Sequence, residues 1–194
     1  MIKKYNLLEP LNTNNLFSFY LILSELKSLF RQGWLQAKIS KDICETVAEH
    51  SFSMTMLAIY LLNEFPELDN QKVIKMCLIH DLAEAIIGDI TPNDTTNQKD
   101  KFSLEKQAIS KIFTHFHNGD YWIELWNEFE SRQSNESIFV KDIDKLDMLL
   151  QSLIYEKIST EDLSVFKQSA LNSFNLDKIK KHALDIIKQA SQNC

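Results

Sequence analysis

The stretch Ile79–Pro92 reads IHDLAEAIIGDITP, and it places one histidine and three carboxylates in an otherwise apolar segment: His80, Asp81, Glu84 and Asp89. Ionised side chains persist in a protein interior only where they are paired or bound to a cation. His80 and Glu84 are four residues apart, so a helix would place both on one face. The stretch therefore indicates a helical segment that carries a buried site for a divalent cation.

The residues before this stretch follow the same helical pattern. Buried positions recur at i, i+3, i+4 and i+7, through Val73, Met76, Cys77 and His80. Asp69 can cap the start of this helix, and the pattern ends at Gly88. His80 is thus predicted to continue the buried face.

Another helix is predicted upstream, beginning at Thr46. The segment TVAE at 46–49 has the form of a capping box, in which a hydroxyl is followed three residues later by a carboxylate. His50 lies in the first turn and Pro66 ends the helix. The apolar stripe of this helix is predicted to run through Phe52, Met56, Ile59 and Tyr60.

Helices are predicted for most of the remaining chain. Their expected ranges are about 14–33, with Gly33 as its stop, and 102–116, 120–131, 136–157 and 162–189. The chain has only three glycines and three prolines, where average usage would give roughly 14 and 10. We therefore expect an all-α bundle of about six to seven helices, formed as one domain over 1–194 with its core at about 14–157. The leucine and isoleucine stripes of the last helix, 162–189, are expected to serve packing, with no chemistry attached.

Composition and charge narrow the partners and the compartment. The net charge of −6 disfavours a nucleic-acid polymer, which needs a basic face, but allows a small phosphorylated molecule. Three cysteines without CxxC spacing, Cys44, Cys77 and Cys194, predict reduced thiols. We find no signal peptide and no stretch that could span a bilayer, so we expect a cytoplasmic protein without a membrane partner.

A carboxylate far downstream supports the cation site. In FVKDIDKLDMLL at 139–150, Val140, Ile143 and Met148 lie four before, one before and four after Asp144, which places Asp144 on or beside the buried face. Asp142, which has lysines close by, is predicted to be a solvated surface charge. Helical bundles build metal sites from inward-facing side chains of facing helices, and the candidate ligands here are His50, His80, Asp81 and Asp144.

An isolated histidine, an HD doublet about 30 residues later and a distant aspartate form a pattern that resembles HD-domain phosphohydrolases. The similarity extends to GW at 33–34, VAEHSFSM at 47–54, LIHDLAEAIIGDITPND at 78–94 and FVKDIDKLDMLLQ at 139–151. These segments look like the branch that contains the 5'-deoxynucleotidases, and they cover about 14–157. The resemblance implies an HD-domain bundle with the metal site in its core, a metal-dependent phosphomonoesterase acting on (deoxy)ribonucleoside 5'-monophosphates, and a homodimer.

The resemblance also implies a role for each matching residue. His50, His80, Asp81 and Asp144 match the metal ligands, and Glu84 matches the acid that acts on the attacking water. Asp89 matches a residue that accepts a hydrogen bond from the sugar, and it is treated as catalytic together with Glu84. The expected substrate-binding residues are Arg31, Gly33, Trp34, Asp89, Ile90, Thr91 and Pro92.

The sequence departs from the bacterial deoxynucleotidase at a position that matters for phosphate binding, and its loop from Trp34 to His50 is slightly longer. In the bacterial enzyme an arginine that orients the phosphate directly precedes the tryptophan, whereas this chain has Gly33 before Trp34 and its arginine at position 31. Candidates for the phosphate anchor are therefore Arg31, Lys38 and Lys41.

A mixed shell of imidazoles and carboxylates favours a divalent transition metal, Mn²⁺, Co²⁺, Fe²⁺ or Zn²⁺, over Mg²⁺. Two other functions stay open: an HD phosphohydrolase acting on another phosphorylated small molecule, and a non-catalytic metal- or nucleotide-binding module. Simpler interpretations also remain for two residues, because Glu84 could be a solvated helix partner and Asp89 could cap a turn after Gly88.

Overall fold

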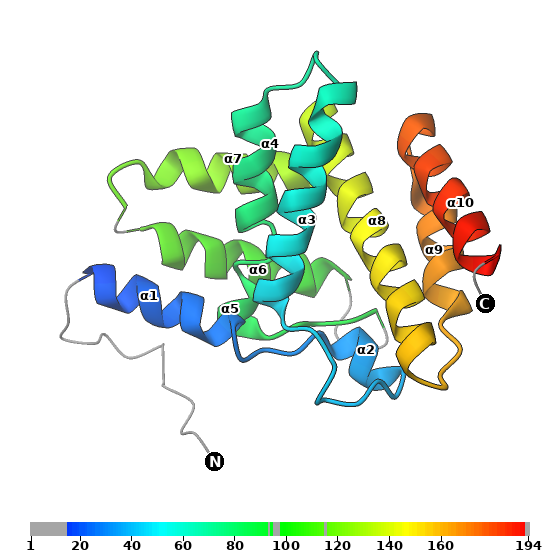
Figure 1. Cartoon of the computed structure of the whole chain (residues 1–194). Coiled ribbons are helices and arrows are strands. Elements are labelled where there is room, and N and C mark those ends of the chain that lie inside the picture. The colour runs from blue at the N-terminus through cyan, green and yellow to red at the C-terminus, as the bar shows by residue number, and fades with distance from the viewer. Residues whose placement is uncertain (1–14, 93, 95–97, 115, 193–194) are drawn as a thin grey trace.

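Helices are the regular elements of this protein (Figure 1). The computed structural model describes residues 15–92, 94, 98–114 and 116–192, and within these ranges the only β pairing is an isolated bridge between Phe30 and Thr46. The all-α prediction is confirmed. The elements are α1 (Asn15–Leu26), α2 (Gln32–Gln36), α3 (Val47–Leu61), the 3-10 turn η1 (Leu62–Glu64), α4 (Asn70–Ile79), α5 (Glu84–Ile87), α6 (Gln98–Phe113), α7 (Gly119–Ser131), α8 (Asn135–Ile158), α9 (Ser164–Ser173) and α10 (Asp177–Gln192).

Three of the predicted helices are each divided in two. The range 14–33 covers α1 and the start of α2, the range 69–88 contains α4 and α5, and the range 162–189 covers α9 and most of α10. Gly33 lies inside α2, so its prediction as a helix stop is wrong. The apolar periodicity continues across each break because both members of a pair bury a face in the same molecule, and periodicity does not reveal where the backbone turns.

The predicted helix starts at Thr46 and Asp69 are confirmed. The Thr46 hydroxyl accepts a hydrogen bond from the Glu49 N–H, and the Glu49 carboxylate accepts one from the Thr46 N–H, which completes the capping box. The Asp69 carboxylate accepts hydrogen bonds from the backbone of Gln71 and Lys72. Both caps satisfy N–H groups that a helix start leaves without intrahelical partners.

The predicted apolar stripe of α3 is wrong, because it lies on the exposed face. Phe52 is 67% exposed, Met56 49% and Tyr60 77%, and Ile59 is also exposed. The buried face is the one that carries Val47, His50, Met54, Ala58 and Leu61. Both faces of this helix show apolar residues at helical spacing, so the sequence alone does not distinguish them.

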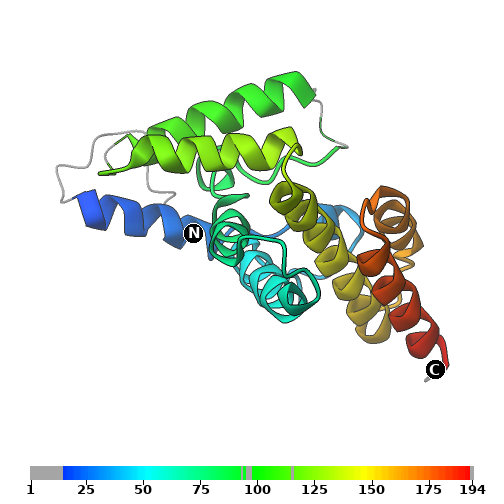
Figure 2. The same ribbon diagram turned by 90° about the horizontal axis from the view of Figure 1, so that it is seen from above.

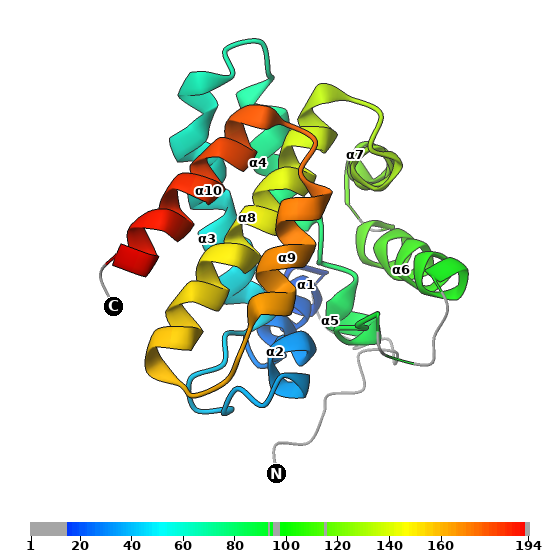
Figure 3. The same ribbon diagram turned by 90° about the vertical axis from the view of Figure 1, so that its right-hand side faces the viewer.

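Helix α8 runs through the centre of the bundle. It packs against α3, α4, α7, α9 and α10, and its inner face is made of Phe139, Val140, Ile143, Leu146 and Leu149. Figure 2 shows the pair α6–α7 and the pair α9–α10 on different sides of α8, and Figure 3 shows α9 and α10 lying along it. Among the described helices, none combines the length and the apolarity that crossing a membrane requires.

Asp142 is buried, so its prediction as a solvated surface charge is wrong. The residue is 1% exposed. Its carboxylate accepts hydrogen bonds from the Asn175 N–H at 2.9 Å, the Asn175 side-chain amide at 3.0 Å and the Leu176 N–H at 2.7 Å. These groups directly precede α10, where backbone N–H groups need acceptors. Asp142 thus joins α10 to the central helix.

Replacing Asp142 should destabilise the bundle. We expect Asp142→Ala to lower the free energy of unfolding by about 1–3 kcal/mol, because it removes the acceptor of several hydrogen bonds at a buried position. Urea denaturation measures the change. Asp185→Ala, at an exposed position of α10, is the control and should stay within about 0.5 kcal/mol of the wild type; equal effects of both changes would contradict this role of Asp142.

Candidate metal centre

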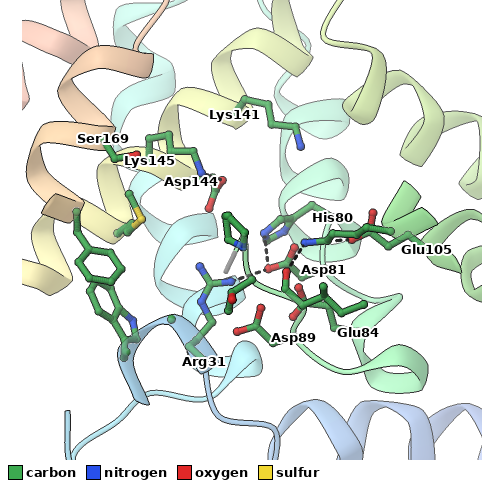
Figure 4. Close-up of a pocket in the computed structure, with 18 of the residues that line it drawn as sticks. Arg31, His80, Asp81, Glu84, Asp89, Glu105, Lys141, Asp144, Lys145 and Ser169 are labelled. Carbon is green, nitrogen blue, oxygen red and sulfur yellow. Dashed lines mark hydrogen bonds and ion pairs between the residues drawn. The ribbon is translucent and has the colours of Figure 1, made fainter. Parts of the chain in front are cut away.

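The four predicted ligands come together at one point in the core. His50 lies in the first turn of α3, His80 and Asp81 follow the end of α4, and Asp144 lies in the middle of α8. His50 Nε2 lies 3.3 Å from Asp144 Oδ1 and 3.8 Å from Asp81 Oδ2. His80 Nε2 lies 3.1 Å from Asp81 Oδ2. Three helices therefore bring two imidazoles and two carboxylates within reach of a single cation. Figure 4 shows three of these residues, His80, Asp81 and Asp144, at the cavity.

The two imidazoles fit a metal because their Nε2 atoms are buried. Within the described residues, neither Nε2 atom has a hydrogen-bond partner. His80 Nδ1 lies 2.8 Å from the Cys77 carbonyl oxygen, which can only accept, so Nδ1 carries the proton and Nε2 presents a lone pair. Trp126 Nε1 donates to the His80 carbonyl at 3.1 Å and fixes the backbone there. A buried lone pair without a donor is costly, and a divalent cation would satisfy it.

The two carboxylates are ionised. Burial raises the pKa of Asp81, but His80, Arg31 and His50 outweigh it and hold that pKa well below its usual range. Burial also raises the pKa of Asp144, but Lys145, His50 and His80 outweigh burial and hold that pKa well below its usual range. Charged oxygens next to imidazole nitrogens form the donor set that divalent transition metals bind.

A proton and a cation compete for His50. Burial and Arg31 lower its pKa, but in the metal-free protein the carboxylates of Asp144 and Asp147 outweigh both and raise it to about 9. Because a metal needs the neutral imidazole, the affinity for the cation rises as pH approaches that value.

Asp147 supports His50 from behind and was missed by the sequence reasoning. Its Oδ2 lies 2.7 Å from His50 Nδ1, and its Oδ1 accepts a hydrogen bond from the Ser53 hydroxyl at 2.6 Å. The signal was present, since Asp147 follows Asp144 by three residues and shares its helical face. Glu45 lies close by, but its Oε1 accepts a hydrogen bond from Trp34 Nε1 at 2.7 Å. Both carboxylates orient residues of the site.

A cavity of about 610 Å³ opens from the metal centre, within the usual size range of small-molecule sites. Every residue that the sequence predicts for catalysis or substrate binding lines it: Arg31, Gly33, Trp34, Glu84, Asp89, Ile90, Thr91 and Pro92. Of the two other candidate phosphate anchors, Lys38 is exposed and Lys41 has its ammonium 4.9 Å from the centre of the Phe30 ring. Neither is among the described residues of the cavity wall.

The acidic side of the cavity holds Glu84 and Asp89. Glu84 is 4% exposed, so its interpretation as a solvated helix partner is wrong. Burial, followed by the charges of Asp81 and Asp89, raises the pKa of Glu84 well above its usual value. Asp89 Oδ2 accepts a hydrogen bond from the Gln32 N–H at 2.6 Å. Asp89 therefore caps the start of α2 and not the turn after Gly88.

The apolar side of the cavity is built differently from the prediction. Trp34 is 2% exposed, because Tyr155 and Phe166 cover its ring at centroid distances of 5.3 and 4.3 Å. Phe166, together with Val165 and Ser169 of α9, lines the cavity. The prediction for 162–189 concerned only its leucine and isoleucine stripes, so the sequence reasoning missed these cavity residues of α9. Apolar spacing shows that a residue lies on a helix face, but not that the face borders a cavity.

Comparisons with known proteins agree on one family. The family profile described as HD domain matches residues 23–185. The 5'-deoxynucleotidase HDDC2 of Dictyostelium discoideum is 37% identical over 152 residues, covering 74% of this chain and 79% of that protein. The 5'-deoxynucleotidase HDDC2 of Homo sapiens is 29% identical over 92% of this chain and 88% of that protein. The crystal structure of the PH0347 protein from Pyrococcus horikoshii OT3 superimposes with a TM-score of 0.75 at 31% identity, covering 91% of this chain and 98% of that one.

Changing Asp147 should weaken the binding of a divalent cation. Asp147→Asn keeps the size of the side chain but removes the charge beside His50 Nδ1, and loss of such a supporting carboxylate typically costs 10–100-fold in metal affinity. Calorimetric titration with Mn²⁺ measures the effect. Asp120→Asn, at an exposed site in the first turn of α7, should bind Mn²⁺ like the wild type. Wild-type affinity in Asp147→Asn would remove Asp147 from the support of the site.

Proposed function

The chain belongs to the HD domain family, and on that premise we propose that it is a metal-dependent 5'-deoxynucleotidase, which hydrolyses deoxyribonucleoside 5'-monophosphates to nucleoside and phosphate. One observation carries the proposal. Two buried imidazole nitrogens without hydrogen-bond partners face two ionised carboxylates beside a cavity that can hold a nucleotide. Relatives named 5'-deoxynucleotidase match from 74% to 92% of the chain, which supports the same activity.

We propose that His50, His80, Asp81 and Asp144 hold one divalent ion. Their nitrogen and oxygen donors suit Mn²⁺, Co²⁺, Fe²⁺ or Zn²⁺ better than Mg²⁺. Such an ion, when bound, lowers the pKa of a coordinated water to about 7 and offsets the charge of the phosphate.

Glu84 is assigned the proton transfer. Burial raises its pKa first, and Asp81 and Asp89 add to the effect, so the carboxyl group exchanges a proton closer to neutral pH than a solvated glutamate does. It takes the proton of the attacking water and delivers it to the leaving 5'-oxygen. Glu84 Oε2 is buried and lacks a hydrogen-bond partner in the described structure, which suits a group that acts on substrate.

The remaining cavity residues bind and orient the nucleotide. Arg31 lies at the start of α2, where its guanidinium can reach the phosphate, and Asp89 accepts a hydrogen bond from the sugar with the oxygen that does not bind Gln32. Phe166 offers an aromatic face to the nucleoside, while Trp34 supports Phe166 from behind. Gly33, Ile90, Thr91 and Pro92 complete the wall. Apart from His50, which is fully buried beside Asp144, all groups assigned a role in hydrolysis line one cavity, which disfavours a non-catalytic binding module.

The assembly and the location of the protein are also proposed. The exposed apolar face of α3, formed by Phe52, Met56, Ile59 and Tyr60, supports a homodimer, because contiguous apolar patches mark interaction sites. The match over 23–185 supports one domain. Free thiols at Cys44 and Cys77 support the cytoplasm; Cys194 lies outside the described residues.

A phosphate-release assay tests the activity. Mn²⁺- or Co²⁺-loaded protein should release phosphate from dAMP, dGMP, dCMP, dTMP or dUMP faster than from the ribose counterparts. Glu84→Gln should lower kcat by about 10²–10⁴-fold, the usual contribution of acid–base catalysis, with its metal content unchanged. Glu105→Gln, a half-buried carboxyl of the same wall, is the matched control and should keep most activity. Full turnover in Glu84→Gln, or no release from any deoxynucleotide, would refute the proposal.

A second measurement tests the dimer. Met56→Glu places a charge in the exposed face of α3 and should convert a dimer into a monomer in light-scattering chromatography, because an unpaired buried charge opposes association. Leu184→Glu, which adds the same charge at an exposed leucine of α10, should leave the mass unchanged. A monomeric wild type would contradict the assembly.

A further inference from the structure

The cavity contains several cations, but most of them are already engaged. Its acidic residues are Asp81, Glu84, Asp89, Glu105, Glu130 and Asp144, and its basic residues are Arg31, Lys101, Arg132, Lys141 and Lys145. A phosphate monoester that enters this cavity needs positive groups whose present partners can release them. The partner of each cation therefore decides which of them can bind the substrate.

Lys101 and Lys141 are held by groups outside the metal centre. Lys101 Nζ donates to the Ile90 carbonyl at 2.8 Å and lies 3.6 Å from Glu105 Oε1. Lys141 Nζ lies 2.8 Å from Glu130 Oε1 and 3.6 Å from the centre of the Phe129 ring. Neither set of contacts includes a candidate metal ligand, so a bound metal would leave both ammonium groups engaged. Arg132 is exposed at the end of α7, where solvent ions screen its charge.

Arg31 and Lys145 have a different kind of partner. Arg31 Nη1 lies 3.2 Å from Asp81 Oδ2, and Lys145 Nζ lies 3.1 Å from Asp144 Oδ2. Both partners are carboxylates of the candidate metal centre, and Figure 4 shows the two cations reaching it from α8 and from the start of α2. A divalent ion on those carboxylates would offset their negative charge and weaken their hold on the two cations.

The two oxygens of Asp144 face different groups. Oδ1 lies 3.3 Å from His50 Nε2, on the side of the proposed metal, whereas Oδ2 contacts Lys145. The ammonium group of Lys145 therefore donates a hydrogen bond directly to a carboxylate of the candidate metal centre. An anion bound at that centre would lie within reach of it.

We propose that Lys145 is a phosphate-binding residue, which acts together with Arg31 to hold the phosphoryl group of the substrate beside the metal centre. This inference rests on the proposed function. The competing interpretation is that Lys145 only stabilises the charge of Asp144. The two differ in what its removal weakens: phosphate binding in the first case, and metal binding in the second.

Calorimetry on Lys145→Gln distinguishes them. The matched control is Lys141→Gln, which removes the same charge from the same cavity one turn earlier on α8. Inorganic phosphate is titrated into Mn²⁺-loaded protein, and Mn²⁺ alone into metal-free protein. We expect the Kd for phosphate to rise about tenfold or more in Lys145→Gln, as loss of a charge-assisted hydrogen bond implies. The Kd for Mn²⁺ should stay within about twofold, and Lys145→Arg should restore most of the phosphate affinity.

Three results would overturn the inference. They are an unchanged phosphate Kd in Lys145→Gln, an equal loss in Lys141→Gln, and weaker Mn²⁺ binding with unchanged phosphate binding. Phosphate binding that depends on Lys145 in a protein that hydrolyses no deoxynucleotide would support the site and refute the proposed function, so the two failures are distinguishable.

Discussion

Two imidazole nitrogens that are buried beside two carboxylates impose the main constraint on this structure. His50 and His80 present Nε2 atoms without hydrogen-bond partners in the described core, and Asp81 and Asp144 bring negative charge to the same point. A divalent cation bound at this point would satisfy both nitrogens and offset the negative charge. The packing of α3, α4 and α8 thus serves the ligand geometry, and a divalent ion bound there would join the three helices.

The metal ligands of the site lie deep in the bundle, and hydrogen bonds fix the two histidines there. His80 is fixed through its carbonyl by Trp126 and through Nδ1 by Cys77, and His50 is fixed by Asp147. These contacts lie in the bundle core, where packing leaves little freedom. The outer walls of the cavity come from α2, the segment after α5, α6, α7 and α9. Hydrolytic chemistry therefore depends on the core, while the choice of substrate depends on the walls.

For the binding of an anion, the charges within the cavity matter more than the net charge of the chain. The protein carries −6 overall, yet five basic side chains line the same cavity as six acidic ones. Pairing with these acids offsets the energetic cost of placing the basic side chains in the cavity. Carboxylates that bind a metal then change from partners of the basic residues into ligands, which links the binding of the metal to the binding of an anion.

The sequence by itself determined the helical class, the starts at Thr46 and Asp69 and the set of four residues that meet in the core, because local capping chemistry and apolar spacing encode them. Only the tertiary structure decided which face of α3 is buried, that Asp142 caps α10 while Asp147 supports His50, and that Phe166 lines the cavity and covers the ring of Trp34. The reason is physical. Spacing shows that a side chain lies on a given helix face, but the environment of that face depends on which distant segment packs against it.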